Sequence, residues 1–138
     1  MKKILFLCSA NSCRSQMAEG IANYYGKGKL IAFSAGANPA GVNPYAIKVM
    51  KEIGIDISHQ RSKKTDEFAG KQFDYIITLC ESAKQECPFF PGQSIRIHWD
   101  IKDPATATGI EEQIMTEFRN CRDVLVEKIK NLIKEINQ

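Results

Sequence analysis

The chain has 138 residues, 43% of them hydrophobic, and its formal net charge is +3. This length suits one domain with a proper core, so we expect residues 1–138 to form a single domain. No apolar run approaches the roughly 20 residues of a membrane span, and a positive charge this mild and dispersed does not indicate nucleic acid as a partner.

The five cysteines argue against a disulfide scaffold. Their number is odd, and Met1-Lys2-Lys3 precedes only four apolar residues, too few for a signal peptide. We therefore expect a cytoplasmic protein whose cysteines are thiols at rest, so that any disulfide among them is transient and catalytic. No cysteine pair has zinc-finger spacing, and His59 and His98 lie in no ligand-like cluster, so a structural zinc site is not expected.

The first predicted elements are a strand and a helix joined by a short loop. Ile4-Leu5-Phe6-Leu7 has the length and composition of a buried strand, whereas apolar residues recur at helical spacing from Gln16 to Ala22. The stretch between them, Cys8-Ser9-Ala10-Asn11-Ser12-Cys13-Arg14-Ser15, is the connecting loop. Loops of this kind wrap backbone N–H groups around a tetrahedral oxyanion and direct a helix N-terminus at it.

Cys8 and Arg14 give this loop its chemistry. Cysteine, five residues, arginine and serine form the signature of the cysteine-dependent phosphatases. The planar arginine side chain binds two oxygens of a phosphate-like anion, and a thiolate attacks the anion. We expect the positive surroundings to lower the pKa of Cys8. The alternative is that Cys8 is only a small buried residue at a strand end.

Four further elements are predicted between residues 30 and 68. Small residues after the second strand leave room for a ligand above the sheet. Asn43-Pro44 is typical of a helix start, and the polar, basic residues 59–64 are expected to form a solvated surface turn. In chain order the elements are a strand at 30–33, a flexible loop at 34–41, a helix from 44 that ends at Gly54, and a short helix at 65–68.

The second half of the chain predicts two more strands and a long helix. Residues 73–79 are rich in β-branched and aromatic side chains, and residues 93–99 alternate as in an edge strand. From about Ile110 an apolar stripe runs to the C-terminus, and it includes Cys121, which we expect in the core. Strands that alternate with helices predict an α/β three-layer sandwich, with a four-stranded parallel sheet flanked by helices.

The carboxyl ends of the strands in such a sheet form the active-site rim, which brings Cys8, Cys80 and Asp103 together. Asp103 follows the last strand, and its carboxylic acid is the candidate that protonates the departing oxygen of the anion. The alternative is that Asp103-Pro104 is an ordinary turn.

Cys80 and Cys87 are the second informative pair. In a regular helix their Cα atoms would be about 10 Å apart, whereas a disulfide needs roughly 4.4–6.8 Å. The two thiols can therefore meet only where the segment is not a regular helix. Two thiols in addition to Cys8 favour a reductase, because a reductase must deliver two electrons, whereas a phosphatase needs only water.

The chain resembles the thioredoxin-coupled arsenate reductases, which share the fold of the low-molecular-weight protein tyrosine phosphatases. The similarity covers nearly the whole chain, and the Cys80/Cys87 pair is its most specific part. The matching motifs are Cys8-Ser9-Ala10-Asn11-Ser12-Cys13-Arg14-Ser15-Gln16-Met17-Ala18-Glu19-Gly20, Ser34-Ala35-Gly36, Gly41-Val42-Asn43-Pro44, Ile53-Gly54-Ile55-Asp56-Ile57-Ser58, Thr78-Leu79-Cys80, Cys87-Pro88, His98-Trp99 and Asp103-Pro104.

This resemblance implies an arsenic-detoxifying enzyme that reduces arsenate to arsenite with three thiols. Cys8 would attack arsenate held by Arg14, while Asp103 assists departure of a hydroxyl. Cys80 would then attack Cys8 and release arsenite, and Cys87 would attack Cys80. Thioredoxin would reduce the resulting disulfide. No tightly bound cofactor is implied, and we expect a monomer.

The resemblance also assigns supporting roles around the loop. Asn11 would brace it, and Ser15 would hydrogen-bond the Cys8 sulfur and help to keep it a thiolate. Part of the family binds potassium here, where Asn11, Glu19 and Ser34 would suit it, although the basic Lys63-Lys64 stands where an acidic residue is expected. The residues expected to bind the oxyanion or support the loop are Ser9, Ala10, Asn11, Ser12, Cys13 and Ser15.

Two other functions stay open at this point. A phosphotyrosine phosphatase of the same fold would also carry Cys13, but it usually has aromatic residues where Ala105 and Thr106 stand here. A non-catalytic anion sensor would keep the loop and Arg14 and would have no use for Cys80 or Cys87. Weak phosphatase side activity is expected even of a reductase, because the loop holds phosphate as well as arsenate.

Overall fold

The computed structural model describes residues 1–81, 83, 90 and 92–137. Four strands form one sheet in the order β2-β1-β3-β4, and every neighbouring pair is parallel. Their bounds are Lys2–Leu7 for β1, Leu30–Ala35 for β2, Tyr75–Thr78 for β3 and Ile95–His98 for β4. The predicted four-stranded parallel sheet is therefore confirmed.

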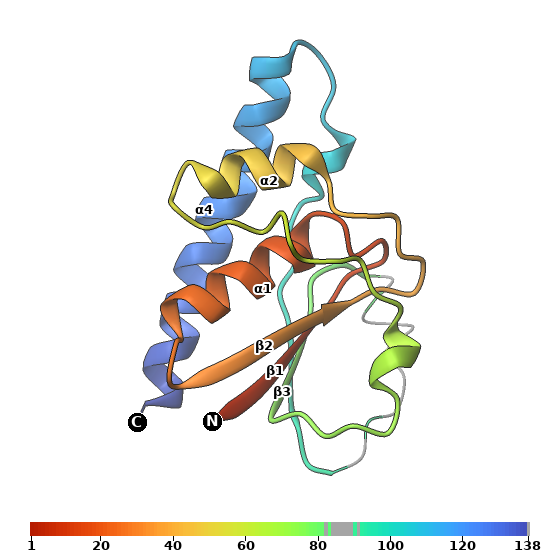
Figure 1. Cartoon of the computed structure of the whole chain (residues 1–138), viewed down its shortest axis with the longest axis vertical. Helices are drawn as coiled ribbons and strands as arrows, with labels where there is room; N and C mark the ends of the chain where they lie inside the picture. The colour runs from red at the N-terminus through yellow and green to blue at the C-terminus, as the bar shows by residue number, and fades with distance from the viewer. Residues whose placement is uncertain (82, 84–89, 91, 138) are drawn as a thin grey trace.

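Three α-helices lie to one side of the sheet (Figure 1). They are α1 (Arg14–Tyr25), α2 (Pro44–Lys51) and α4 (Glu111–Ile136), and their apolar faces form the larger core with one face of β1 and β3. Cys121 of α4 is buried in this core, as predicted. The other face of the sheet is covered by a smaller cluster that includes Phe68, Phe73 and Phe90. Phe68 belongs to the short helix η1 (Thr65–Phe68).

Local sequence signals explain most of the element boundaries. Asn43 caps α2, and its side chain accepts a hydrogen bond from the Tyr45 N–H at 2.8 Å. Helix α1 begins at Arg14 rather than Gln16, so the last two residues of the predicted loop, Arg14 and Ser15, belong to its first turn. Strand β2 continues through Ser34 to Ala35, which the sequence placed in a flexible loop, because its pairing with β1 extends to Leu7.

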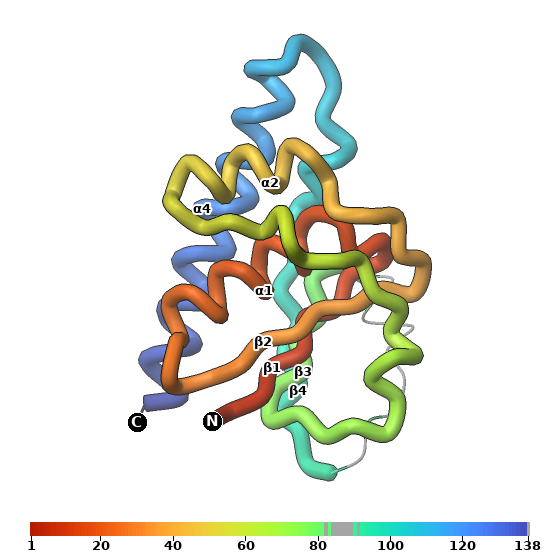
Figure 2. Tube along the Cα trace, viewed as in Figure 1, coloured from red at the N-terminus to blue at the C-terminus, as the bar shows by residue number. Residues whose placement is uncertain are grey.

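Residues 59–64 differ from the prediction of a solvated turn. Arg61 and Lys64 do face water, but Lys63 is buried and Ser62 donates hydrogen bonds to the carbonyl oxygens of Ala10 and Asn11. Figure 2 shows this yellow-green stretch passing the end of β2 and the red loop that follows β1. The prediction assigned one environment to the whole segment because of its charge. In an extended chain, however, successive side chains point to opposite sides, so some face water and others face the protein.

None of the helices among the described residues is long and apolar enough to span a membrane.

Candidate active site

The predicted rim residues meet at the carboxyl ends of β1 and β3. Cys8 directly follows β1, and Cys80 lies two residues beyond β3. Both are buried, and the Cys80 side chain is the largest influence on the pKa of the Cys8 thiol. The Cys80 sulfur also lies 3.9 Å from the Ser9 hydroxyl oxygen, and it accepts a hydrogen bond from the Ala83 N–H at 3.4 Å. Cys87, the third thiol of the predicted relay, lies outside the described residues.

The loop after Cys8 turns its carbonyl oxygens outward. Those of residues 9–12 accept hydrogen bonds from the N–H groups of Asn38, Ala40 and Asn43, the Ser62 hydroxyl and the Gln16 amide. Because the described peptide bonds are all trans, the N–H groups of residues 10–13 point the opposite way. The Ala10 N–H accordingly lowers the pKa of the Cys8 thiol, as an N–H group directed at a thiolate does. The loop thus presents amide donors on the side of the thiol, as an oxyanion cradle does.

Asn11 holds the tightest bend of this loop. It has a φ of 47°, the left-handed conformation that asparagine tolerates better than most residues. Its fully buried side chain makes four hydrogen bonds. The amide nitrogen donates to Ser15 Oγ (2.8 Å) and Ser34 Oγ (3.0 Å). The amide oxygen accepts from the Lys63 N–H (2.8 Å) and the Gln16 amide (2.9 Å).

Gly36 lets the loop lie directly against the end of β2. A Cβ atom here would come within 3.0 Å of the carbonyl oxygens of Cys8 and Ser9 and of the Asn11 nitrogen. All three are backbone atoms, which cannot rotate out of the way. The small residues after β2, from which the sequence predicted room for a ligand, in this case make room for the oxyanion loop.

Arg14 projects from the first turn of α1 into the same rim. Its Nη1 donates to the carbonyl oxygens of Ile101 (2.9 Å) and Leu79 (3.4 Å), which fixes the plane of the guanidinium. Its Nη2 lies 3.5 Å from Asp103 Oδ2. Nε is buried and has no hydrogen-bond partner within the described part of the chain. A buried donor is stable only if something accepts its hydrogen bond, so this edge of the guanidinium suits a bound anion.

Asp103 lies at the mouth of the site and is partly exposed. Its Oδ1 accepts a hydrogen bond from the Ala105 N–H at 3.0 Å and so caps the short helix η2 (Pro104–Thr106). The other oxygen faces Arg14. The turn interpretation and the acid interpretation of Asp103 are therefore compatible, because each uses a different carboxylate oxygen.

The pKa of Cys8 differs from the sequence prediction. It is raised, chiefly because the Cys80 thiol is hydrogen-bonded to it and secondly because the site is buried. The Arg14 guanidinium and the Ala10 N–H act in the opposite sense. The predicted lowering is wrong for this arrangement, since it considered Arg14 and left out the neighbouring thiol.

The remaining loop residues line or support the cradle. Burial raises the pKa of Cys13, and the sulfur of Cys13 lies 3.5 Å from the Ser12 hydroxyl. Ser15 is fully buried and accepts from Asn11, while the hydrogen bond from Ser15 to Cys8 stays a prediction.

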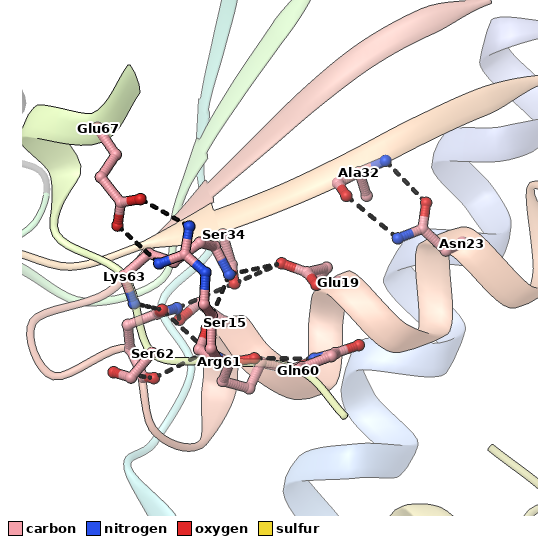
Figure 3. Close-up of polar contacts among 12 residues, drawn as sticks. Ser15, Glu19, Asn23, Ala32, Ser34, Gln60, Arg61, Ser62, Lys63 and Glu67 are labelled. Carbon is pink, nitrogen blue, oxygen red and sulfur yellow. Dashed lines mark hydrogen bonds and ion pairs between the residues drawn. The ribbon is translucent and has the colours of Figure 1, made fainter. Parts of the chain in front are cut away.

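The potassium implied by the resemblance does not fit the donors in the structure. Asn11 turns its amide nitrogen toward Ser34, and the Ser34 hydroxyl donates to Glu19 Oε1 at 2.8 Å. Lys63 places its ammonium 3.4 Å from the same Glu19 oxygen. Figure 3 shows Lys63, Ser34 and Glu19 side by side between α1 and the end of β2. Among the described residues, no cluster of three His, Cys, Asp or Glu side chains could hold a metal ion.

Sequence reasoning did not find the supporting residues Gln16, Gly36, Ser62 and Lys63. Gly36, Ser62 and Lys63 act on the loop through contacts between distant segments, such as the hydrogen bond from Ser62 to the Asn11 carbonyl. Gln16 acts on it from five residues away, by donating to the Asn11 amide oxygen. For Lys63, only its place near Glu19 was indicated, by the resemblance, which puts Lys63-Lys64 where the potassium site of the family has an acidic residue.

Comparisons with known proteins agree with this geometry. Residues 3–138 match the family model "Low molecular weight phosphotyrosine protein phosphatase". The chain is 46% identical over 129 residues to an arsenate reductase of Halalkalibacterium halodurans, covering 94% of this chain and 93% of that protein. It is 39% identical over 137 residues to a glutaredoxin arsenate reductase of Synechocystis sp., covering 99% and 100%. A solved arsenate reductase in the phosphate-binding state has a TM-score of 0.79 at 38% identity, with 99% of each chain covered.

Proposed function

The chain belongs to the low molecular weight phosphotyrosine protein phosphatase family, and we propose that it reduces arsenate to arsenite with electrons from its own cysteines. The observation that carries this proposal is the meeting of two buried thiols, Cys8 and Cys80, at the oxyanion loop, where Cys80 is the largest influence on the pKa of Cys8. Hydrolysis of a phosphate ester needs one thiol and a water molecule. A second thiol in contact with the first supplies the partner for disulfide formation.

The first step is attack by the Cys8 thiolate on arsenic. A sulfur–arsenic bond forms and an arsenic–oxygen bond breaks, and Asp103 donates the proton with which that oxygen leaves as water. Arg14 and the N–H groups of the loop stabilise the charge on the remaining oxygens. The partly exposed position of Asp103 at the mouth of the site, with Oδ2 3.5 Å from Arg14 Nη2, supports this role.

The second step is the reduction itself. The Cys80 thiolate attacks the Cys8 sulfur, a disulfide forms, and the sulfur–arsenic bond breaks with its electron pair left on arsenic. Arsenic goes from the pentavalent to the trivalent state while two thiols are oxidised. For each arsenate the reaction consumes two thiols and yields arsenite, one disulfide and water, so that atoms and electrons balance.

The third step returns Cys8 to its thiolate. Cys87 attacks Cys80, the Cys8–Cys80 disulfide is replaced by Cys80–Cys87, and an external dithiol protein reduces the new disulfide. We propose thioredoxin as that reductant. The glutaredoxin arsenate reductase of Synechocystis sp. makes glutaredoxin the alternative to be tested beside it. We propose that the cycle runs in the reducing environment of the cytoplasm, where thiols are kept reduced between turnovers.

The test is an arsenate-dependent NADPH oxidation assay with thioredoxin and thioredoxin reductase, run in parallel with glutaredoxin, glutathione and glutathione reductase. We expect wild type to turn over and Cys80→Ser and Cys87→Ser to reduce arsenate at most once per chain. Hydrolysis of p-nitrophenyl phosphate, by contrast, should persist in both variants and disappear in Cys8→Ser. NADPH consumption that does not depend on arsenate would disprove the proposal, and hydrolysis alone would make the chain a phosphatase.

A further inference from the structure

Lys63 is a buried lysine that forms an ion pair with the largely buried Glu19 side chain. Its side chain is only 10% exposed, and that of its ion-pair partner Glu19 is 13% exposed. The ammonium lies 2.8 Å from the Arg61 carbonyl oxygen and 3.4 Å from Glu19 Oε1. Charged side chains are almost never this buried unless they are paired, and removing one partner leaves the other charge uncompensated.

The pair is connected to the oxyanion loop by two routes. On the side-chain route, Glu19 Oε1 accepts from Ser34 Oγ, which in turn accepts from the Asn11 amide nitrogen. On the main-chain route, the Lys63 N–H donates to the Asn11 amide oxygen at 2.8 Å. Both routes end on the one described non-glycine residue with positive φ, at the bend of the loop. The position of the pair therefore controls how Asn11 holds that bend.

We infer that the buried Lys63 ammonium is a positioning group for the oxyanion loop, which supplies from within the chain the positive charge that Glu19 requires. Neutralised in this way, the Glu19 carboxylate keeps Ser34 and Asn11 oriented so that the loop N–H groups face the anion. The inference deepens the proposed function, since it concerns the same loop, but it applies to phosphate binding whether or not the chain reduces arsenate.

An internal ammonium has a consequence for the response to salts. The oxygen of Glu19 that would face a monovalent cation already faces Lys63. The Asn11 amide donates to Ser34, and the Ser34 hydroxyl donates to Glu19. Oxyanion binding by the wild-type protein should therefore not depend on which monovalent cation is present. A variant without the ammonium should depend on it, because a small cation can then approach Glu19.

The experiment measures inorganic phosphate binding by calorimetry in potassium chloride and in choline chloride at equal ionic strength. The variants are Lys63→Met, Lys63→Met/Glu19→Gln and Lys64→Met. Lys64 is the matched control, because its side chain is 61% exposed and pairs with the surface residue Asp66, whose side chain is 81% exposed. In Glu19→Gln the amide oxygen can still accept from Ser34 while the charge is gone.

We expect wild type and Lys64→Met to bind phosphate equally well in both salts. Lys63→Met should bind about tenfold more weakly in choline chloride, regain part of the loss in potassium chloride, and raise the KM for arsenate more than it lowers kcat. The double variant should recover most of the affinity in both salts. If Lys63→Met does not fold, the double variant decides alone, and it must fold and bind phosphate nearly as wild type does.

Three results would overturn the inference. The first is a wild-type phosphate affinity that depends on potassium. The second is a loss of phosphate affinity in Lys64→Met as large as that in Lys63→Met. The third is a double variant that binds phosphate no better than Lys63→Met. Failure of the proposed function is a separate result, namely a wild-type protein that binds phosphate normally and does not reduce arsenate.

Discussion

Arg14 is held in place by Ile101, whose carbonyl oxygen accepts a hydrogen bond from Nη1 at 2.9 Å. Ile101 follows the edge strand β4, and Arg14 opens the helix that follows β1, so this single contact joins the two ends of the oxyanion site. It fixes the plane of the guanidinium and leaves the buried Nε to the ligand.

Arg14→Lys should therefore lose much of its affinity for phosphate, although the positive charge is kept. An ammonium cannot donate to Ile101 and Leu79 and at the same time present a planar pair of donors to the anion. We expect phosphate affinity to fall by at least about tenfold, equivalent to about 1.4 kcal/mol, as measured by calorimetry. Arg119→Lys on the surface of α4 is the control, and an Arg14→Lys protein that binds as tightly as this control would contradict the prediction.

Removing the Cys80 thiol should make Cys8 more acidic. The Cys80 thiol is the largest cause that raises the pKa of Cys8, so its loss lowers that pKa and increases the thiolate fraction at neutral pH. In Cys80→Ala we expect the midpoint of Cys8 alkylation against pH to move down by about one unit or more. Iodoacetamide labelling with mass spectrometry of the Cys8 peptide measures it.

The same labelling experiment has an internal control in Cys121→Ala, which leaves the Cys8–Cys80 pair intact and should leave the midpoint unchanged. A midpoint in Cys80→Ala that stays in place or moves to higher pH would show that the contact between the two thiols does not govern the pKa of Cys8.

The buried Cys121 should make the fold sensitive to alkali. Burial raises its pKa to about 12 from 9.0, so between these values the folded state keeps a proton that the unfolded state has released. The stabilisation is complete below about pH 9 and is lost as the pH rises, at up to about 1.4 kcal/mol per unit for this one group.

This loss should be absent from Cys121→Ala. Urea unfolding of both proteins is measured from neutral pH to about 10.5. We expect the wild type to have the larger free energy of unfolding at neutral pH, and the difference to shrink above about pH 9. Groups that titrate equally in both proteins cancel from the difference. A difference in unfolding free energy that is constant over the whole pH range would refute the assignment of a buried, protonated Cys121.

Gly36→Ala should damage the site without unfolding the protein. The added methyl group meets backbone atoms of Cys8, Ser9 and Asn11, so the loop must shift and its N–H groups move with it. We expect phosphate binding to weaken by about tenfold or more. Gly28→Ala is the matched control: Gly28 has a φ of 84° with no atom near its Cβ position, so it should cost about 1 kcal/mol of stability and no affinity.

The sheet and the meeting of Cys8 with Cys80 could be predicted for the same reason. Two of the strands are followed closely by a cysteine, Cys8 after β1 and Cys80 after β3, and parallel topology brings these carboxyl ends together. Local signals such as the cap at Asn43 also predicted where α2 begins.

What the sequence could not predict depends on contacts between distant segments. Whether Lys63 faces water or Glu19 is decided by how the chain passes the end of β2, which no local pattern encodes. The pKa of Cys8 likewise follows from the distance between two thiols that are 72 positions apart. The end of β2 was missed by two residues because its pairing with β1 extends it to Ala35, whereas β3 and β4 are shorter than the predicted strands at 73–79 and 93–99.

The outward-turned carbonyls of residues 9–12 have a consequence for how the protein tells its substrates apart. Because three separate segments, residues 38–43, Ser62 and Gln16, hold these carbonyls, the ring of amides is already shaped before any anion arrives. A rigid ring of one size cannot discriminate between arsenate and phosphate, which have nearly equal shapes. Discrimination must then come after capture: arsenic accepts the electron pair that a departing disulfide leaves behind, and phosphorus does not. Phosphate is thus a competitor that occupies the ring unproductively, so the rate of arsenate reduction in a cell should follow the ratio of the two anions rather than arsenate alone.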